Sequence, residues 1–349
     1  MGKGKRKEMN RPKTRLRILF LGTRKLGFVG LSTLVKQGFN IVGVVTKDFE
    51  ITEGFTTKEF TSFCKQNKIP LFITEKIHSG PIYEQLKNLR FDMGISLYWR
   101  RLIKEPLIKL APAGFINAHA SDLPKYRGFA ATSWSILLGN AYCGLCIHRV
   151  VPGIADNGNI LRSCKISLDE DTTIKTLMDE VTRKSIEMTV DVLKEQETVW
   201  PDIVQGKEQN ESKASLAYPR LPEDGEINWN HSAEEIHRHV RSVTNPYPGA
   251  FSWWKGQKVH IWKTKLVSEW PEFVGIPGHI AKIEKGGSIW VLTGCGVLEI
   301  QKISLNDTDE ISPGEVIQSL QTRFGMHYSL EIEAIKNRLE KMEARLSCV

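Results

Sequence analysis

Short apolar runs alternate with segments of helical periodicity through the first part of the chain. The runs are residues 17–22, 40–46, 69–73 and 91–97. Each is long enough for a buried β-strand. Between them, residues 56–66 and 82–89 carry apolar positions three or four apart. Strands separated by helices are typical of βαβ units, so the pattern predicts an α/β domain with a doubly wound, mostly parallel, Rossmann-like sheet.

The pattern changes after residue 218, where short strands separated by glycine-rich turns follow one expected helix at 232–243. The expected strands are residues 251–254, 258–265, 278–283, 289–293 and 297–303. This spacing predicts a small OB-like β-barrel. The expected division is a basic tail (1–14), a catalytic α/β domain (15–204), the OB-like domain (205–312) and a helical extension (313–349).

The last predicted helix, residues 329–347, carries a narrow apolar stripe at alternating spacings of three and four. The stripe consists of Ile332, Ile335, Leu339, Met342 and Leu346. Such spacing is the a/d pattern of a two-helix seam. It predicts either a homodimer contact or docking of the helix on its own chain.

The formal net charge of +8 over 349 residues is concentrated at one end, because residues 1–17 hold eight Lys or Arg against one Glu. The rest of the chain is nearly neutral, so a nucleic-acid partner is not expected. Cys143 and Cys146 have CxxC spacing without a second pair, so no metal site is expected. No apolar run is long enough to span a bilayer, and a cytoplasmic protein without a membrane partner is predicted.

The loop Gly22–Gly27 after the first strand is followed by neither Lys-Ser nor Lys-Thr and lacks the GxGxxG spacing. A P-loop and a dinucleotide-binding fingerprint are therefore both disfavoured.

Three polar side chains are expected to meet at the carboxyl edge of the sheet. Asn117 and His119 alternate at the end of an apolar run, and Asp156 lies in the tight loop 153–158. Ligands of open α/β sheets bind at that edge. An amide donor, an imidazole and a carboxylate suit acyl transfer to an amine. Asn117 would bind the developing oxyanion, His119 would move a proton, and Asp156, with its pKa raised by burial, would help to accept one.

Residues 117–128 read Asn-x-His-x-Ser-x-Leu-Pro-x-Tyr-Arg-Gly, and a Gly-x-x-Asp-x-Gly loop follows. Over approximately residues 17–303 the chain resembles the folate-dependent formyltransferases, and within them the sugar-nucleotide N-formyltransferases, which include the formyltransferase domain of the bifunctional lipid A aminoarabinose enzyme. Methionyl-tRNA formyltransferase is a related enzyme. The resemblance implies 10-formyltetrahydrofolate as the formyl donor and a primary amine as the acceptor.

The resemblance also implies two further groups of site residues. Those expected to bind the folate are Ser96, Leu97, Tyr98, Trp99, Arg100, Ile154 and Asn157. Those expected to bind the acceptor are Ser121, Tyr126, Arg127 and Phe129. The chain departs from the family at two points. The Asp156 loop is one residue longer, and Phe129 stands where the aminoarabinose enzyme has an arginine.

Three functions remain open from the sequence: an amino-sugar nucleotide N-formyltransferase, a methionyl-tRNA formyltransferase and an inactive folate- or nucleotide-binding module. Residues 205–310 contain twelve Lys or Arg and fourteen Asp or Glu, and residues 48–54 are acidic. Neither feature favours tRNA, whose phosphates require basic surface. The complete Asn117, His119 and Asp156 set disfavours the inactive module. The sequence therefore favours the sugar nucleotide as acceptor.

Overall fold

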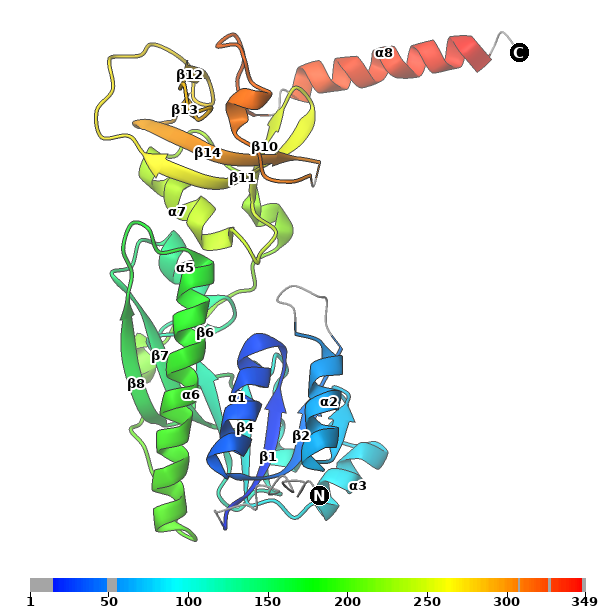
Figure 1. Cartoon of the computed structure of the whole chain (residues 1–349), viewed down its shortest axis with the longest axis vertical. Helices are drawn as coiled ribbons and strands as arrows, with labels where there is room; N and C mark the ends of the chain where they lie inside the picture. The colour runs from blue at the N-terminus through cyan, green and yellow to red at the C-terminus, as the bar shows by residue number, and fades with distance from the viewer. Residues whose placement is uncertain (1–14, 49–54, 307, 326–327, 347–349) are drawn as a thin grey trace, which may run out of the picture. The chain divides into compact units, whose positions relative to one another are not determined.

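The computed structural model describes the chain except residues 1–14, 49–54, 307, 326–327 and 347–349 (Figure 1). The chain divides into two compact units, each described separately below. The first comprises Met1–Ser135, Asn140–Asp169 and Thr176–Pro219, and the second comprises Ile136–Gly139, Glu170–Lys175 and Arg220–Val349.

A seven-stranded sheet forms the centre of the first unit, with strand order β3-β2-β1-β4-β5-β7-β8. The strands are β1 (Arg17–Gly22), β2 (Asn40–Thr46), β3 (Leu71–Ile73), β4 (Met93–Leu97), β5 (Phe115–His119), β7 (Tyr142–Val150) and β8 (Ile160–Ser167). The five strands from β3 to β5 are parallel, whereas β7 and β8 run antiparallel to their neighbours. The predicted mostly parallel α/β sheet is therefore confirmed.

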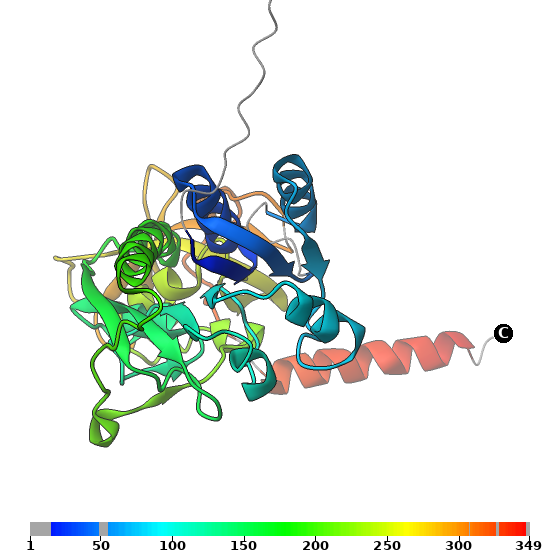
Figure 2. The same cartoon turned by 90° about the horizontal axis from the view of Figure 1, so that it is seen from below.

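Helices cover both faces of this sheet. Helices α1 (Arg24–Gln37), α2 (Thr57–Asn67) and α6 (Ile174–Val199) contribute to the core on one face, and α3 (Gly80–Asn88) and α4 (Glu105–Ile108) to that on the other. A further helix, α5 (Ala131–Leu137), follows β6 along the chain. Successive β1 side chains point to opposite faces, so Ile18 and Phe20 pack with residues of α1, α2 and α6, whereas Leu19 and Leu21 pack with residues of α3 and α4. In Figure 2, α1 (blue) and α6 (green) lie beside β1 (dark blue).

The segment 205–217 packs on the first unit, although the sequence pattern assigned it to the second domain. Lys207 exchanges two main-chain hydrogen bonds with Ile160, at 2.8 Å each. The short strand β9 (Leu216–Ala217) pairs with β6 (Arg127–Gly128). A 3-10 turn, η1 (Glu211–Lys213), lies between these contacts. This polar segment crosses the loops after β5 and β7.

The second unit contains a five-stranded antiparallel sheet of order β10-β11-β14-β13-β12. The strands are β10 (Ala250–Trp254), β11 (Gln257–Leu266), β12 (Ile280–Ile283), β13 (Ile289–Leu292) and β14 (Val297–Leu305). Helix α7 (Ala233–Val243) begins with a Ser232–Glu235 capping box and buries Ile236 and Val240. The predicted small β-domain after the α/β domain is confirmed.

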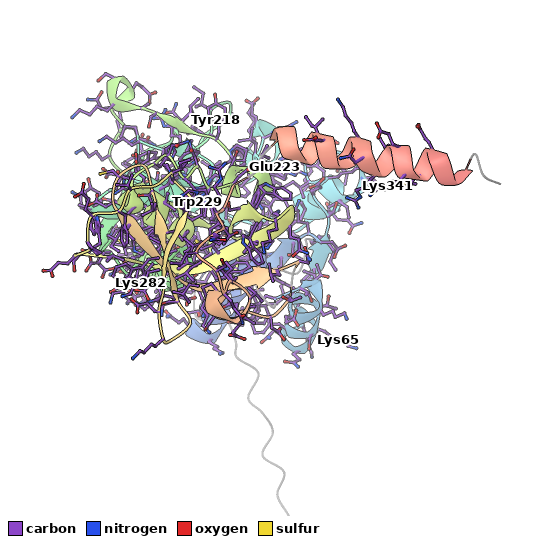
Figure 3. The ribbon with its side chains drawn as sticks, turned by 90° about the horizontal axis from the view of Figure 1, so that it is seen from above. Lys65, Tyr218, Glu223, Trp229, Lys282 and Lys341 are labelled. Carbon is purple, nitrogen blue, oxygen red and sulfur yellow. The ribbon has the colours of Figure 1, made fainter. Side chains whose placement is uncertain are left out.

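Segment 322–325 bridges the two edges of that sheet. The amide of Ile280 donates to the Thr322 carbonyl (3.3 Å), and that of Gly325 donates to the Trp253 carbonyl (2.9 Å). Trp229, labelled in Figure 3, stacks on Phe324 with ring centres 5.4 Å apart. The segment therefore connects β12 to β10 and covers the end of the second core. Two 3-10 turns complete the unit, η2 (Pro222–Gly225) and η3 (Pro313–Glu315).

Helix α8 (Tyr328–Leu346) follows the β-domain, as expected from the sequence. Ile332, Ile335, Leu339 and Met342 are each 52–60% exposed. These four side chains of the stripe are thus not covered by the described residues of their own chain. The side chain of Leu346 lies outside the described residues. Among the described residues, no helix is both long enough and apolar enough to cross a membrane.

Candidate active site

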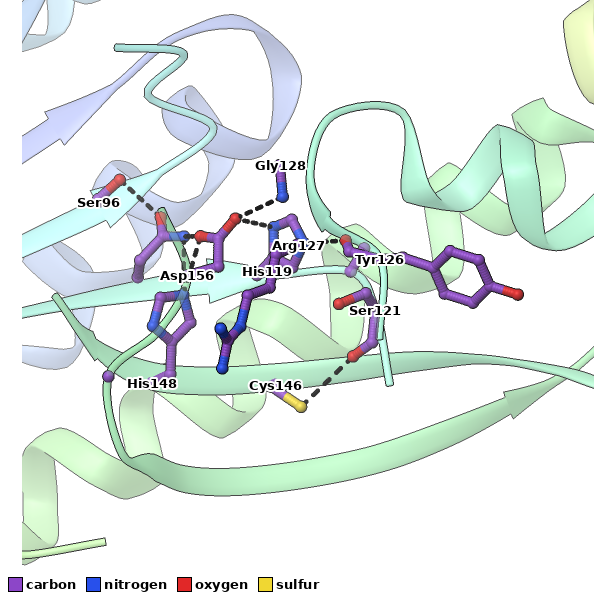
Figure 4. Close-up of polar contacts among 12 residues, drawn as sticks. Ser96, His119, Ser121, Tyr126, Arg127, Gly128, Cys146, His148 and Asp156 are labelled. Carbon is purple, nitrogen blue, oxygen red and sulfur yellow. Dashed lines mark hydrogen bonds and ion pairs between the residues drawn. The ribbon is translucent and has the colours of Figure 1, made fainter. Parts of the chain in front are cut away.

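Three neighbouring strands place polar side chains in one row at the edge of the first sheet. The register pairs Asn117 of β5 with Ser96 of β4 on one side and with His148 of β7 on the other. Ser96 Oγ donates a hydrogen bond to Asn117 Oδ1 (2.7 Å), and Asn117 Nδ2 lies 3.2 Å from His148 Nε2 (Figure 4). The oxygen of the Asn117 amide thus faces Ser96, and its NH₂ group faces His148 and Asp156.

Asp156 reaches this row from the loop that follows β7. Its Oδ1 lies 3.3 Å from His148 Nε2 and 3.4 Å from Asn117 Nδ2. Its Oδ2 accepts a hydrogen bond from the Gly128 amide (2.9 Å) and lies 3.5 Å from His119 Nδ1 (Figure 4). The structure thus brings Asn117, His119 and Asp156 together, although Asp156 is 37 residues from His119 in the sequence.

The environment of Asp156 keeps its carboxylate ionised. Burial alone raises the pKa of this carboxyl, but His119, His148 and the Gly128 amide together outweigh that effect, and the net pKa lies below its usual value. The expectation of a pKa raised by burial is therefore wrong, because it did not include the second imidazole or the amide. A carboxylate of this kind is a weak proton acceptor and a strong partner for a protonated imidazole.

Both nitrogens of the His119 ring face hydrogen-bond acceptors. Nε2 lies 3.0 Å from the Tyr126 carbonyl oxygen, and Nδ1 faces the Asp156 carboxylate. Both contacts are satisfied when each ring nitrogen carries a hydrogen. The ring is therefore arranged as a proton donor. To donate to a substrate, Nε2 must give up its hydrogen bond to the Tyr126 carbonyl oxygen.

His148 is a site residue that the sequence analysis missed. Its side chain is 2% exposed, its Nδ1 lies 2.8 Å from the Arg149 carbonyl oxygen, and its ring centre lies 6.3 Å from that of His119. The signal is weak in the sequence, since a lone histidine in an apolar strand has no motif around it. The signal becomes clear only once β7 is known to pair antiparallel with β5.

The residues expected to bind folate differ in accessibility. Ser96, Leu97 and Trp99 are buried, and Trp99 packs in the core beneath the sheet. Tyr98 is half-buried in the left-handed conformation (φ 60°), where its carbonyl accepts a hydrogen bond from Thr23 Oγ1 (2.6 Å). Arg100 and Ile154 are exposed, and Asn157 is half-buried. The ring of Trp99 is therefore not open to a ligand in this conformation, whereas Tyr98, Arg100, Ile154 and Asn157 are at least partly accessible.

The residues expected to bind the acceptor also divide into two kinds. Phe129 is 47% exposed and Tyr126 is half-buried, whereas Ser121 and Arg127 are 0% and 2% exposed. Arg127 forms a bidentate ion pair with Glu211 and contacts Gln209. Neither Ser121 nor Arg127 is therefore open to an acceptor in this conformation. Gln209 and Glu211 were missed because the sequence pattern assigned their segment to the second domain.

No cluster of three or more potential metal ligands occurs among the residues that the structure describes. Cys143 and Cys146 lie on β7 as buried thiols, and burial raises their pKa values to about 11 and about 12. Both groups therefore stay protonated near neutral pH.

The first unit thus combines an α/β sheet that has a short antiparallel extension with a cluster of Asn117, His119 and Asp156 at the carboxyl ends of its parallel strands, and the second unit is a β-domain. Residues 17–193 match the family described as formyl transferase, and residues 221–321 match the formyl transferase C-terminal domain. The chain belongs to the formyl transferase family, as the sequence motif indicated.

Two curated relatives are similar to most of this chain. The bifunctional polymyxin resistance protein ArnA of Wigglesworthia glossinidia brevipalpis is 32% identical over 262 residues, covering 73% of this chain. The chain spans only 38% of the length of that protein. Methionyl-tRNA formyltransferase of Acetivibrio thermocellus is 29% identical over 306 residues, covering 86% of this chain and 96% of that protein.

Two solved structures share the fold. One is WlaRD, a sugar 3N-formyl transferase with dTDP and 5-N-formyl-THF, at TM-score 0.62 and 18% identity, covering 84% of this chain and 99% of that one. The other is the N-formyltransferase from Helicobacter canadensis with folinic acid and dTDP-3-aminofucose, at TM-score 0.62 and 18% identity, covering 82% of this chain and 98% of that one. At this identity the likeness concerns the fold alone.

Proposed function

We propose that this chain transfers the formyl group of 10-formyltetrahydrofolate to the amine of an amino-sugar nucleotide. The observation that carries the proposal is the meeting of the Asn117 amide, the His119 imidazole and the Asp156 carboxylate at the carboxyl edge of the parallel strands, with each contact to Asp156 within 3.5 Å. These are the groups that acyl transfer to an amine needs: a donor for the carbonyl oxygen, a proton donor and a fixed anion.

Each side chain has a separate task in this scheme. Asn117 Nδ2 donates to the formyl oxygen, where negative charge develops as the amine nitrogen bonds to the formyl carbon. The bond from that carbon to N10 of the folate then breaks. The amine loses one proton and N10 gains one, so the products are a formamide and tetrahydrofolate. His119 supplies the proton to N10 and regains one from the proton that the amine loses, and the ionised Asp156 stabilises the protonated ring.

The donor would bind at the loop after β4. Tyr98 is half-buried and Arg100 is exposed in that loop, while Ile154 and Asn157 lie in the loop after β7 that carries Asp156. The folate supplies an activated formyl group. The protein positions that group near Asn117 and excludes water from it.

A sugar nucleotide is favoured as acceptor by the charge balance of the second unit. Within that unit, residues 220–310 contain twelve Asp or Glu and ten Lys or Arg, whereas a tRNA ligand requires several phosphate contacts. A methionyl-tRNA formyltransferase is the second candidate, because a relative with that name aligns over 96% of its own length. The resemblance of residues 117–128 to the motif of the sugar-nucleotide N-formyltransferases supports the first candidate.

Incubation with 10-formyltetrahydrofolate and a panel of amino-sugar nucleotides tests the proposal. Mass spectrometry should show one acceptor gaining the mass of a single formyl group, and the His119→Ala variant should not produce it. Methionyl-tRNA is included as a competing acceptor, and its formylation would favour the second candidate. Folate binding without turnover on either acceptor would instead favour an inactive binding module.

A further inference from the structure

Gln209 lies where its side-chain amide touches both loops of the site. Its Nε2 donates hydrogen bonds to the carbonyl oxygens of Asp156 and Gly158, at 2.7 Å each. Its Oε1 accepts from Arg127 Nε (3.1 Å) and Nη2 (2.8 Å). A primary amide has two hydrogens and two lone pairs, so these four bonds use its full capacity. The reverse orientation would set donors against donors, and the amide therefore has one orientation.

Arg127 binds the oxygen of the Gln209 amide, on the side away from the Asp156 loop. Its guanidinium is buried and forms two parallel bonds with Glu211, from Nη1 to Oε2 (3.0 Å) and from Nη2 to Oε1 (2.7 Å). Bidentate pairs of this kind fix the plane of the guanidinium. Since β6 also pairs with β9, the strand carrying Arg127 and the segment carrying Gln209 are joined by main chain as well as by side chains.

The contacts around Asp156 form a closed ring. The Gly128 amide binds the Asp156 carboxylate, the neighbouring Arg127 binds Gln209, and Gln209 binds the Asp156 main chain. The main chain of Asp156 has φ 55°, a left-handed conformation that residues other than glycine rarely adopt. Such a conformation persists only where the surroundings hold it. Here the surroundings hold both the main chain and the carboxylate.

We propose that Gln209, supported by Arg127, is a positioning residue that holds the Asp156 main chain so that the carboxylate faces His119 and His148. The inference rests on the proposed function in that Asp156 serves formyl transfer. Gln209 acts through Asp156 alone, so its loss changes kcat and leaves the KM values for both substrates nearly constant. The two bonds that Gln209 donates to the 153–158 loop also account for the position of the Asp156 carboxylate in a loop that is one residue longer than the family pattern.

The Gln209→Ala variant removes all four bonds, and Gln209→Glu keeps an acceptor for Arg127 while losing both donated bonds. A misplacement of about 1 Å can cost about 100-fold in rate, so each variant should lower kcat about 10- to 100-fold with KM changed less than about threefold. Gln205→Ala is the matched control, because Gln205 is an exposed glutamine of the same segment that donates only to the nearby Ile203 carbonyl. It should retain wild-type kinetics.

The decisive measurement combines Gln209→Ala with Asp156→Asn. If Gln209 acts only through Asp156, the double variant should have the kcat of Asp156→Asn alone, to within about twofold. Multiplied losses, or a Gln209→Ala enzyme with wild-type kcat, would overturn the proposal.

Amide hydrogen exchange provides a readout that does not depend on turnover. Residues 153–158 should exchange faster in Gln209→Ala and in Gln209→Glu, and unchanged exchange in both would overturn the inference. A wild-type protein with no formyl transfer to any acceptor would contradict the proposed function, while the exchange result would still decide whether Gln209 holds the loop.

Discussion

Replacing Asp156 with asparagine removes the charge of the site carboxylate and leaves its shape nearly unchanged. The carboxylate lies 3.3 Å from His148 Nε2 and 3.5 Å from His119 Nδ1, and it accepts the Gly128 amide at 2.9 Å. An asparagine keeps one oxygen that can accept the Gly128 amide. Its other end is an NH₂ group, and the neutral side chain cannot stabilise a protonated His119 or His148 by charge. By comparison with other charged groups that orient a catalytic histidine or bind a developing anion, we expect kcat to fall about 100- to 10,000-fold.

The same substitution has a predictable effect on stability. The folded-state pKa of Asp156 is depressed, so its ionised form stabilises the fold, and this contribution is fully present above the ordinary carboxyl pKa of about 3.9. The contribution is lost as the pH falls through the folded-state value. Each unit of depression corresponds to about 1.4 kcal/mol. The asparagine variant should therefore be less stable than wild type at neutral pH, and the difference should shrink below about pH 4.

Two measurements check this reasoning. Single-turnover formyl transfer gives the rate, and chemical denaturation between about pH 3 and pH 8 gives the free energy of unfolding. Asp179→Asn is the control, because Asp179 is a surface carboxylate on α6 paired with Lys25. An Asp156→Asn enzyme within about fivefold of wild-type kcat would refute the assigned role. A stability difference that stays constant from pH 3 to pH 8 would refute the electrostatic account.

Three further predictions concern separate features. His148→Ala should lower kcat about 10- to 100-fold with KM little changed in steady-state kinetics, because His148 contacts both Asn117 and Asp156; an unchanged kcat would exclude it from the site. Deleting residues 1–14 should leave both kinetic constants unchanged, because the tail carries no motif, and a large rise in KM would contradict this. Leu339→Asp should weaken self-association more than catalysis, because Leu339 is 53% exposed within the apolar stripe of α8; sedimentation at several concentrations tests this, and a wild-type protein that stays monomeric would refute the dimer.

The sequence by itself determined which elements form and where the central chemistry lies. Apolar runs and helical spacing report whether one face of a local segment is buried, and that information is contained in neighbouring residues. The strands containing Phe20, Ile95 and Ile261 could therefore be predicted to within a few residues. The Asn117–Gly128 motif placed an amide and an imidazole at a strand end, because alternation along a strand and the glycine and proline after it are local properties as well.

The tertiary structure alone decided which distant groups complete the site. His148 faces Asn117 only because β7 runs antiparallel to β5 in one particular register. Gln209 reaches the Asp156 carbonyl from 53 residues further along the chain. Arg127 is buried in an ion pair with Glu211 instead of being open to the amine substrate. The sign of the Asp156 pKa shift also depends on the sum of burial, two imidazoles and one amide. Neither these three contacts nor the pKa shift can be read from neighbouring residues in the sequence. Each depends on atoms that only the folded chain brings within a few ångströms of one another.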